Sequence, residues 1–483
     1  MSGMRSSCAS VRRRAPAAAA AAGPRGWAAA GPGRRRAARA AAGGNGTSEE
    51  YTGQAFTIKT FNAISEVGLE RFPGGRYEVS GDDAALSSEA MAIMLRSHKL
   101  SAAEVPKTCR CIARCGAGTN NIPVKEMTAL GVPVFNTPGA NADAVKELVV
   151  CALLLASRGI VEGIAHVREV INVEEDLDNE RIAKRIEKDK KMFKGVELAG
   201  KTLGVIGLGQ IGGRVVEAAL GLNMAVVGYD PQLSLEAALK LPGDRMERCE
   251  TLEELMRAAD YVSIHVPYIP GVTHHLIDAA MMRAAKPGLN ILNFARGEIV
   301  DGEALKAMYD SGAMTGKYVS DFADEHLNGH PKHIVMPHLG ASTEEAEENS
   351  AMMAAETIML FLQTGSIRHS VNFPTTMVGP NNGYRLCLVH RNEPGALGSI
   401  TTYLGEKNIN ITRQVNNSRG DIAYTVVDMD EAPADADALQ DELVGCFDGL
   451  LSSRFIGQVF KDEMGSPGTY FRVYGDSLIP ESG

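Results

Sequence analysis

Three polar side chains in the second half of the chain have the types and positions that hydride transfer at a hydroxyl-bearing carbon requires. Arg296 follows an apolar run, and its guanidinium could hold a substrate carboxylate through two parallel hydrogen bonds. His338 follows another apolar run, and its imidazole could take the hydroxyl proton near neutral pH. A carboxylate beside this imidazole would stabilise the imidazolium and raise its pKa, and we expect Glu325, or alternatively Asp324, to supply it.

A second motif is suited to the cofactor that would accept the hydride. The apolar run 203–206 enters the turn Gly207-x-Gly209-x-x-Gly212, a helical pattern follows, and a second apolar run ends at Asp230. Such glycines let the backbone approach a pyrophosphate at a helix N-terminus, and an acid about 20 residues further on accepts hydrogen bonds from the adenosine ribose. Because the Asp230 carboxylate would repel a 2′-phosphate, the pattern predicts NAD rather than NADP.

The bulk composition describes an ordinary globular protein, with 45% hydrophobic and 22% charged residues among 483. This length favours about three domains. No stretch approaches the roughly 18–20 uncharged apolar residues of a membrane helix. Cys109, Cys111 and Cys115 crowd together without the matching second cluster of a zinc site, so we expect reduced thiols and no metal.

Charge is distributed unevenly along the chain. The formal net charge is −10, yet residues 1–48 contain nine arginines and no Asp, Glu or Lys, so the remainder carries a net −19. An acidic body argues against a nucleic-acid partner. The Ala-, Gly- and Arg-rich first 48 residues are typical of a disordered organelle transit peptide, and the alternative is a disordered tail that the mature protein keeps. We expect the plastid (chloroplast stroma), with the mitochondrial matrix as the alternative.

The remaining pattern predicts an α/β protein with two Rossmann-like lobes and a small C-terminal module. Short apolar runs at 56–60, 91–95, 111–114 and 132–135 alternate with helical patterns, a helix is expected at about 142–157, and an exposed charged helix at 174–194. Residues 385–457 read as a ferredoxin-like βαββαβ unit. The expected domains are a substrate-binding lobe at 49–147 completed by about 338–370, an NAD-binding lobe at 148–337, a linker at 371–383, the module at 384–458 and an unassigned tail at 459–483.

Residues 56–343 resemble the D-isomer-specific 2-hydroxyacid dehydrogenases. The motifs that carry the resemblance are Gly207-x-Gly209-x-x-Gly212, His265-Val-Pro267, Asn293-x-x-Arg296-Gly297 and Pro337-His338-x-Gly340. Further motifs resemble the branch of that family whose substrate is D-3-phosphoglycerate. These are Leu95-Arg-Ser97, Gly116-Ala-Gly-Thr-Asn-Asn-Ile122, Gly131-Val-Pro-Val-Phe-Asn-Thr-Pro138, His338-Leu-Gly-Ala-Ser-Thr343 and Val371-Asn-Phe-Pro374.

The resemblance implies roles for individual positions. Catalysis is expected from Arg296, Glu325 and His338. Substrate binding is expected from Arg96, Ser97, Gly116, Ala117, Gly118, Asn120 and Arg296. NAD binding is expected from Gly207, Gly209, Gln210, Ile211, Gly212, Asp230, His265, Val266, Pro267, Ala295, Asp321, His338 and Gly340. One departure concerns the acid: the family usually places it five positions after the aspartate that matches Asp321, where this chain has His326, with Glu325 four positions on.

The C-terminal module resembles an ACT domain through Leu388-Val-His390-Arg-Asn392-Glu-Pro-Gly395 and Asn408-Ile-Asn410-Ile411. In related dehydrogenases the positions that match His390, Asn392 and Asn410 bind L-serine across a dimer of such modules. The resemblance therefore implies an L-serine effector and a homo-oligomer, a dimer or tetramer. The alternative is a module that only dimerises.

Together these features predict an NAD-dependent dehydrogenase. The resemblance implies oxidation of D-3-phosphoglycerate to 3-phosphohydroxypyruvate, the first step of serine synthesis, with feedback by L-serine. One alternative is a hydroxypyruvate or glyoxylate reductase on the same fold. The other is a non-enzymatic corepressor that senses NADH, because fold alone does not decide function.

Overall fold

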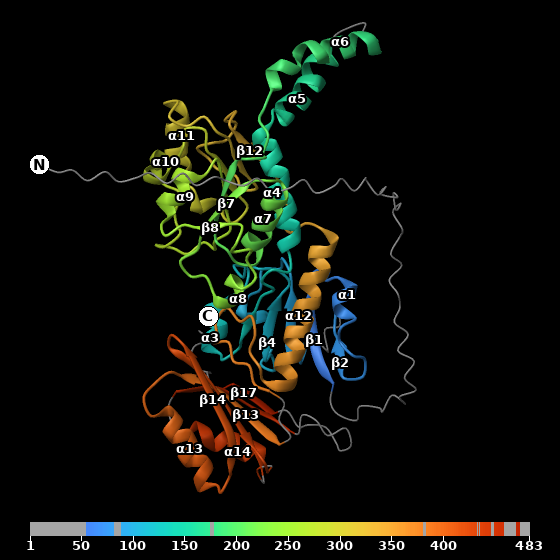
Figure 1. Cartoon of the computed structure of the whole chain (residues 1–483). Coiled ribbons are helices and arrows are strands. Elements are labelled where there is room, and N and C mark those ends of the chain that lie inside the picture. Colours follow the sequence, from blue (N-terminus) through green and yellow to red (C-terminus); the bar gives the residue numbers. More distant parts are fainter. Residues whose placement is uncertain are drawn as a thin grey trace, which may run out of the picture. The chain divides into compact units, whose positions relative to one another are not determined.

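The protein is described here by a computed structural model that covers residues 55–81, 88–173, 178–379, 383–431, 433, 435–445, 449–457 and 470–473 (Figure 1). The predicted leader, residues 1–48, lies outside the described residues, as does most of the predicted tail at 459–483. All described residues lie within one compact unit, residues 50–483.

The first lobe is built on a parallel sheet with the strand order β2-β1-β3-β4-β5. Four of its strands lie within or overlap the predicted apolar runs, and β3 is buried along its whole length. The edge strand β2 is not predicted, because it has only three residues and its middle residue, Glu78, is exposed. The strands are β1 (Phe56–Phe61), β2 (Tyr77–Val79), β3 (Ala92–Leu95), β4 (Cys111–Arg114) and β5 (Val134–Phe135).

A long helix from much later in the chain packs on this first sheet (Figure 1). α12 (Glu344–Thr364) begins after Thr343, whose hydroxyl accepts a hydrogen bond from the backbone N–H of Ala346, and it ends at Gly365 in the left-handed conformation. Its small buried residues, such as Ala351 and Ala355, let it approach the sheet and α1 closely. The shorter helices of this lobe are α1 (Glu66–Leu69) and α3 (Val124–Ala129), with a 3-10 turn at Ala102–Glu104.

The second lobe is built on a parallel sheet with the strand order β12-β11-β10-β9-β6-β7-β8. The direction of the strand order reverses at β6, and ligands of such sheets bind beyond the carboxyl ends of the strands near that point. The strands are β6 (Thr202–Ile206), β7 (Ala225–Tyr229), β8 (Glu247–Arg248), β9 (Tyr261–Ile264), β10 (Asn290–Asn293), β11 (Tyr318–Ser320) and β12 (His333–Val335). The helices are α7 (Gln210–Gly221), α8 (Leu235–Ala238), α9 (Leu252–Ala258), α10 (Ala279–Ala284) and α11 (Gly302–Asp310), with a 3-10 turn at Gly297–Ile299.

A helical segment connects the two sheets. α4 (Ala142–Ser157) matches the predicted helix, and its apolar face, with Val149 and Leu153, packs into the core of the second lobe. It is followed by α5 (Ile160–His166), a π-helical turn at Val167–Ile171, α6 (Asn179–Asp189) and a 3-10 turn at Lys190–Phe193. Within the described ranges no single helix is long and apolar enough to cross a membrane. α4 with residues 160–171 meets that length and composition only as a pair bent by 68°.

The C-terminal module has the predicted element order, β13 α13 β14 β15 α14 β16, in an antiparallel sheet ordered β14-β15-β13-β16-β17. One face of the sheet packs against α13 and α14, with Leu388 and Leu404 in a shared core. The opposite face, with Cys387 and Val426, joins the core around α12. The elements are β13 (Tyr384–Arg391), α13 (Ala396–Glu406), β14 (Ile411–Arg419), β15 (Ile422–Met429), α14 (Ala436–Val444), β16 (Leu450–Ile456) and the unpredicted β17 (Tyr470–Val473).

Candidate active site

The glycine-rich turn follows β6, and steric contacts explain its glycines. Gly207 has a φ of 89°, and a Cβ there would lie 2.8 Å from the backbone of His265. A Cβ on Gly212 would overlap the carbonyl oxygen of Gly207, so α7 could not pack against the turn. Gly209 precedes α7, whose first residues are Gln210 and Ile211, and faces open space. The first N–H groups of α7 are therefore accessible to an anionic group.

Asp230 follows β7 directly, and its carboxylate lies beside the same turn. Its Oδ2 accepts a hydrogen bond from the backbone N–H of Leu208 at 2.9 Å, and its Oδ1 accepts one from the N–H of Gln232 at 2.9 Å. Each carboxylate oxygen can accept a further hydrogen bond. The carboxylate is therefore oriented by the backbone and can still bind hydroxyl groups.

His265, Val266 and Pro267 follow β9 and form the side of the turn opposite Asp230. The backbone N–H of His265 donates to the carbonyl of Ile206 at 2.7 Å, and its Nε2 lies 2.8 Å from the hydroxyl of Ser263. Burial of the imidazole lowers the pKa of His265 to about 3, so this ring is neutral near pH 7. A neutral ring in this position serves to shape the pocket and does not exchange protons with a substrate.

Asp321 connects Arg296 and His338 electrostatically. Burial raises the pKa of Asp321, while the charges of His338 and Arg296 act in the opposite direction. A Cβ on Gly340 would lie 3.4 Å from its Oδ2, which places the His338 loop against this carboxylate. Its Oδ1 is buried without a hydrogen-bond partner among the described residues. A buried acceptor of this kind fits a ligand that brings a donor, such as a carboxamide.

The predicted catalytic residues Arg296 and His338 both follow the ends of strands. Arg296 comes shortly after β10, where the side-chain amide of Asn293 donates to its carbonyl at 2.8 Å and its own Nη1 donates to the carbonyl of Ala295 at 2.6 Å. His338 follows β12 and is exposed, with its ring edge-on to Phe322 at 4.9 Å between centroids. Both side chains therefore remain accessible to a substrate.

Glu325 and Asp324, the two predicted acids, have other surroundings than the buried Asp321. The Glu325 side chain is 90% exposed, and its described contact is an ion pair with His326 at 3.8 Å. Asp324 accepts hydrogen bonds from the backbone N–H groups of His326 and Leu327. Both acids line a cavity of about 780 Å³ that also includes Phe322, the neighbour of His338. Asp321, by contrast, is a carboxyl whose pKa the charge of His338 lowers.

The predicted substrate-binding residues of the first lobe surround one loop, 116–121. The side-chain amide of Asn136 donates to the carbonyl of Ala117 at 2.6 Å, and Ser97 contacts Asn62 at 3.4 Å. A Cβ on Gly118 would lie 2.9 Å from Nη2 of Arg296 and 3.8 Å from Oδ1 of Asn120. The loop therefore brings the first lobe against the strand-end arginine of the second.

Arg114, which the sequence analysis does not single out, joins this group. It ends β4, and its guanidinium donates to the carbonyls of Arg96, at 3.0 Å, and Gly118. A Cβ on Gly116 would lie 3.3 Å from its Nη1. Burial lowers the pKa of Arg114, with further lowering from the charges of Arg296 and Arg96. Its place at the carboxyl end of a parallel strand, directly before the loop, is the sequence signal that could have identified it.

The predicted effector residues lie in two regions of the C-terminal module. His390 is buried in β13, with Nε2 2.8 Å from the Thr425 hydroxyl, and Asn392 follows that strand and donates to the carbonyl of Gly420. Asn410 comes after α13 and donates to Asp430 at 3.2 Å. α13 separates the two regions, so a ligand touching all three positions would need more than one module. No cluster able to hold a metal ion occurs among the described residues.

Comparison with known proteins agrees with this arrangement. Residues 161–340 match the model of the D-isomer specific 2-hydroxyacid dehydrogenase, NAD binding domain. The chain is 33% identical over 334 residues to the D-3-phosphoglycerate dehydrogenase of Haemophilus influenzae, covering 67% of this chain and 74% of that protein. It is 32% identical to the Escherichia coli protein of that name, over 69% of this chain and 77% of the relative. The NAD⁺-bound 3-phosphoglycerate dehydrogenase of Entamoeba histolytica superposes with a TM-score of 0.51 at 25% identity, over 66% of this chain and 99% of that one.

The chain therefore belongs to the D-isomer-specific 2-hydroxyacid dehydrogenase family. It is an NAD-dependent dehydrogenase, and the glycine turn, Asp230 and the buried Asp321 acceptor fit that cofactor. Bound NAD would supply the hydride acceptor.

The low pKa of His265 predicts a defined acid sensitivity. The unfolded chain binds a proton here at about pH 6.5 and the folded one only at about pH 3, so stability falls as the pH decreases from 6.5 toward 3. We expect a His265→Gln variant to lose this part of the pH dependence. Midpoints of urea unfolding between pH 7.5 and 4.5 measure it, with a His274→Gln variant of an exposed histidine as control. Equal pH slopes for the parent and the His265 variant would contradict the assignment.

Proposed function

We propose that the protein oxidises D-3-phosphoglycerate to 3-phosphohydroxypyruvate with NAD, the first step of the phosphorylated route to L-serine. The observation that carries this proposal is the convergence of Arg96, Arg114 and Arg296 on the loop 116–121. Guanidinium groups that converge on one loop repel one another, and a bound anion offsets this repulsion. This substrate brings both a carboxylate and a phosphate. The relatives named above carry the same activity in their names.

Each residue at the strand ends has a role in this reaction. Arg296 holds the substrate carboxylate and polarises the oxygen at the reacting carbon. His338 takes the hydroxyl proton as the hydride leaves that carbon. Asp321 stabilises the resulting imidazolium through its electrostatic interaction with His338. Glu325 could take that role only if its exposed side chain moved toward His338.

The cofactor lies, in this proposal, beyond the carboxyl ends of β6 and β7. Gly209 and the first N–H groups of α7 bind its pyrophosphate, and Asp230 accepts hydrogen bonds from its ribose. Asp321 Oδ1 accepts from the carboxamide. His265 to Pro267 form the wall beside the nicotinamide end.

Activity measurements on the full chain test the catalytic roles. We expect NADH formation from D-3-phosphoglycerate and NAD, with a loss of about 10²–10⁴ in kcat for His338→Ala because its proton transfer is removed. Arg296→Ala should lose turnover to a similar degree, and His274→Ala serves as an exposed control. NADH binding, followed by fluorescence, should be retained in all three variants.

Two results would contradict this assignment. Near-parental turnover in either strand-end variant would remove the role given to that residue. A parent that instead reduces hydroxypyruvate with NADH and ignores D-3-phosphoglycerate would be a hydroxypyruvate or glyoxylate reductase. Binding of NADH without turnover of either substrate would favour a non-enzymatic sensor.

We also propose that the C-terminal module is an ACT domain that binds L-serine at His390, Asn392 and Asn410. Its element order and strand order support this, and burial lowers the pKa of His390, which leaves a neutral ring able to accept or donate a hydrogen bond. Because α13 separates Asn410 from the other two, we place the effector between two modules.

Serine inhibition of the parent and its variants tests this site. We expect L-serine to lower NADH formation, and His390→Ala and Asn410→Ala to abolish that inhibition while keeping uninhibited turnover within about twofold. Asn417→Ala, on the same sheet, is the control. Inhibition retained in both site variants would exclude these residues, and a parent indifferent to L-serine would leave the module with a structural role alone.

A homo-oligomer, dimer or tetramer, is proposed on the distribution of exposed apolar side chains. About half of the large exposed apolar residues described lie in one segment, 154–196, and such clustering marks protein interfaces. They are Leu154, Ile160, Val161, Ile164, Val170, Val173, Ile186, Met192 and Val196. Residues 1–48 are proposed to direct the chain to the plastid or, alternatively, to the mitochondrial matrix.

Light scattering tests the oligomer. We expect the parent to have at least twice the mass of the chain, and Ile164→Lys to lower that mass because a charge in the interface would be desolvated. Val67→Lys, on an exposed apolar residue outside the segment, should leave it unchanged. A monomeric parent would contradict the proposal.

A further inference from the structure

One end of α12 lies in the candidate active site. Glu347, in the first turns of this helix, forms an ion pair with Arg96, with 2.5 Å between Oε1 and Nη2. Both side chains remain partly exposed, 38% for Arg96 and 40% for Glu347. The carbonyl of Arg96 accepts a hydrogen bond from Arg114, so this pair belongs to the arginine group around the loop 116–121.

The pair places a carboxylate where the substrate would place one of its own anionic groups. A guanidinium presents a limited set of donors, so an anion that binds Arg96 must share them with Glu347 or displace it. A carboxylate that stays nearby also repels the incoming anion. Glu347 therefore opposes substrate binding for as long as α12 holds it beside Arg96.

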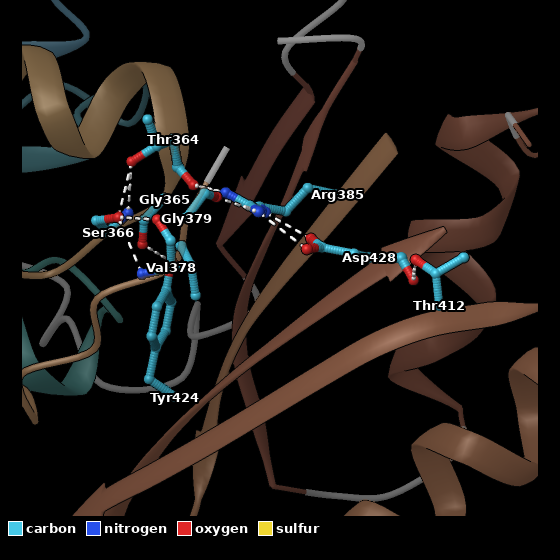
Figure 2. A network of polar contacts seen from close by, with 9 residues as sticks. All are labelled: Thr364, Gly365, Ser366, Val378, Gly379, Arg385, Thr412, Tyr424 and Asp428. Carbon is cyan, nitrogen blue, oxygen red and sulfur yellow. Dashed lines mark hydrogen bonds and ion pairs between the residues drawn. The ribbon is translucent and has the colours of Figure 1, made fainter. Parts of the chain in front are cut away.

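The other end of α12 is fixed by the C-terminal module, as Figure 2 shows for two of the three contacts. Nη1 of Arg385 donates to the carbonyl of Thr364 at 2.6 Å, and the hydroxyl of Tyr424 donates to the carbonyl of Gly365 at 2.7 Å. Nη2 of Arg454 donates to the carbonyl of Phe361 at 2.5 Å. Two of these side chains thus bind the carbonyl groups of Thr364 and Gly365 at the helix C-terminus, and the third adds a donor to the carbonyl of Phe361, which also accepts from the backbone N–H of Gly365.

These capping side chains are themselves held in place. Arg385 is fully buried and forms two hydrogen bonds with Asp428, at 2.6 and 2.9 Å, in addition to its bond to Gly379 (Figure 2). Arg454 is 2% exposed and lies over the ring of Phe361, 4.3 Å from the ring centroid. The module therefore holds the C-terminal end of α12 in place.

α12 is one continuous helix of 21 residues, which corresponds to about 30 Å. No irregular turn separates Phe361 from Glu347, so a displacement at the capped end is carried to the end beside Arg96. The loop that carries His338 precedes the same end, through the cap residue Thr343.

We propose that Glu347 competes with the anionic group of the substrate for Arg96, and that the caps from the C-terminal module hold Glu347 in this competing position. The proposal rests on the proposed function, and it makes Glu347 a residue that sets substrate affinity. Arg454 and Tyr424 are positioning residues, because they act on Arg96 through α12.

A Glu347→Gln variant tests the competition. Removing the charge should lower the KM for D-3-phosphoglycerate about three- to tenfold, the range expected for a nearby charge in a partly exposed site, with kcat and NADH affinity unchanged. Glu345→Gln removes the same charge from an exposed position in the same turn and should leave KM within about twofold. An unchanged or raised KM for Glu347→Gln, or an equal effect of Glu345→Gln, would overturn the proposal.

An Arg454→Met variant tests the role of the module. Methionine keeps apolar contact with Phe361, and the guanidinium atoms Nε and Nη1 have no partner among the described residues, so replacing this buried charge should not unfold the protein. We expect a lower KM, because α12 holds Glu347 less firmly. Arg413→Met, at an exposed position in the same module, is the control.

The double variant Arg454→Met with Glu347→Gln is decisive. Sites this far apart normally act independently, so their KM changes should multiply. The proposal instead predicts that Arg454→Met has no further effect once Glu347 is replaced, and multiplied changes would overturn it. If Arg454→Met fails to fold, Tyr424→Phe removes only one hydroxyl and gives the same test. Calorimetric binding of D-3-phosphoglycerate to the NADH-saturated chain keeps this test separate from the proposed function, which a parent without turnover would contradict.

Discussion

Three guanidinium groups lie around one loop, and the surrounding structure must hold these like charges together against their repulsion. Arg114 is partly buried between Arg96 and Arg296, and its lowered pKa records both the burial and the neighbouring charges. Backbone carbonyls accept hydrogen bonds from Arg114 and Arg296, and the carboxylate of Glu347 accepts one from Arg96. The backbone contacts orient the guanidiniums of Arg114 and Arg296 without neutralising their charges. In the proposed function an anionic substrate supplies the opposing charge.

The cofactor side of the site follows a different physical rule. Close backbone approach at Gly207 and Gly212 is a steric requirement, and it leaves the start of α7 open. Burial then keeps His265 neutral, so the wall of the pocket has no titrating group near pH 7. At Asp321, burial raises the pKa while the charges of His338 and Arg296 oppose that rise, and its buried Oδ1 has no hydrogen-bond partner among the described residues.

The C-terminal module is far from the site in sequence but contacts the helix α12, which carries a residue of the site. Its buried Arg385–Asp428 pair fixes a side chain that caps α12, and the opposite end of that helix carries Glu347. Removing one partner of such a buried pair leaves an uncompensated charge and strongly destabilises a fold. The module packs against one end of the helix whose other end pairs with Arg96.

The sequence by itself determined most of the helices and strands and which residues stand at the strand ends. Apolar runs followed by glycine, arginine or histidine predicted the strands β6, β10 and β12 and the residues at their ends, because strand direction places such residues at one edge of a parallel sheet. The helix α4 and the order of elements in the C-terminal module also followed from hydrophobic periodicity. These properties are local, because the propensity for a helix or strand depends on residues that are near one another in the sequence.

Only the tertiary structure decided which charged groups meet. Spacing in the sequence favoured Glu325 as the acid beside His338, whereas in this structure the Glu325 side chain is exposed and the carboxyl whose pKa the charge of His338 lowers is that of Asp321. Arg114 and Glu347 became part of the site because β4 and α12, 233 residues apart at these positions, pack together. Electrostatic partners depend on distances between side chains from different elements. Those distances are fixed by packing and not by any pattern along the chain.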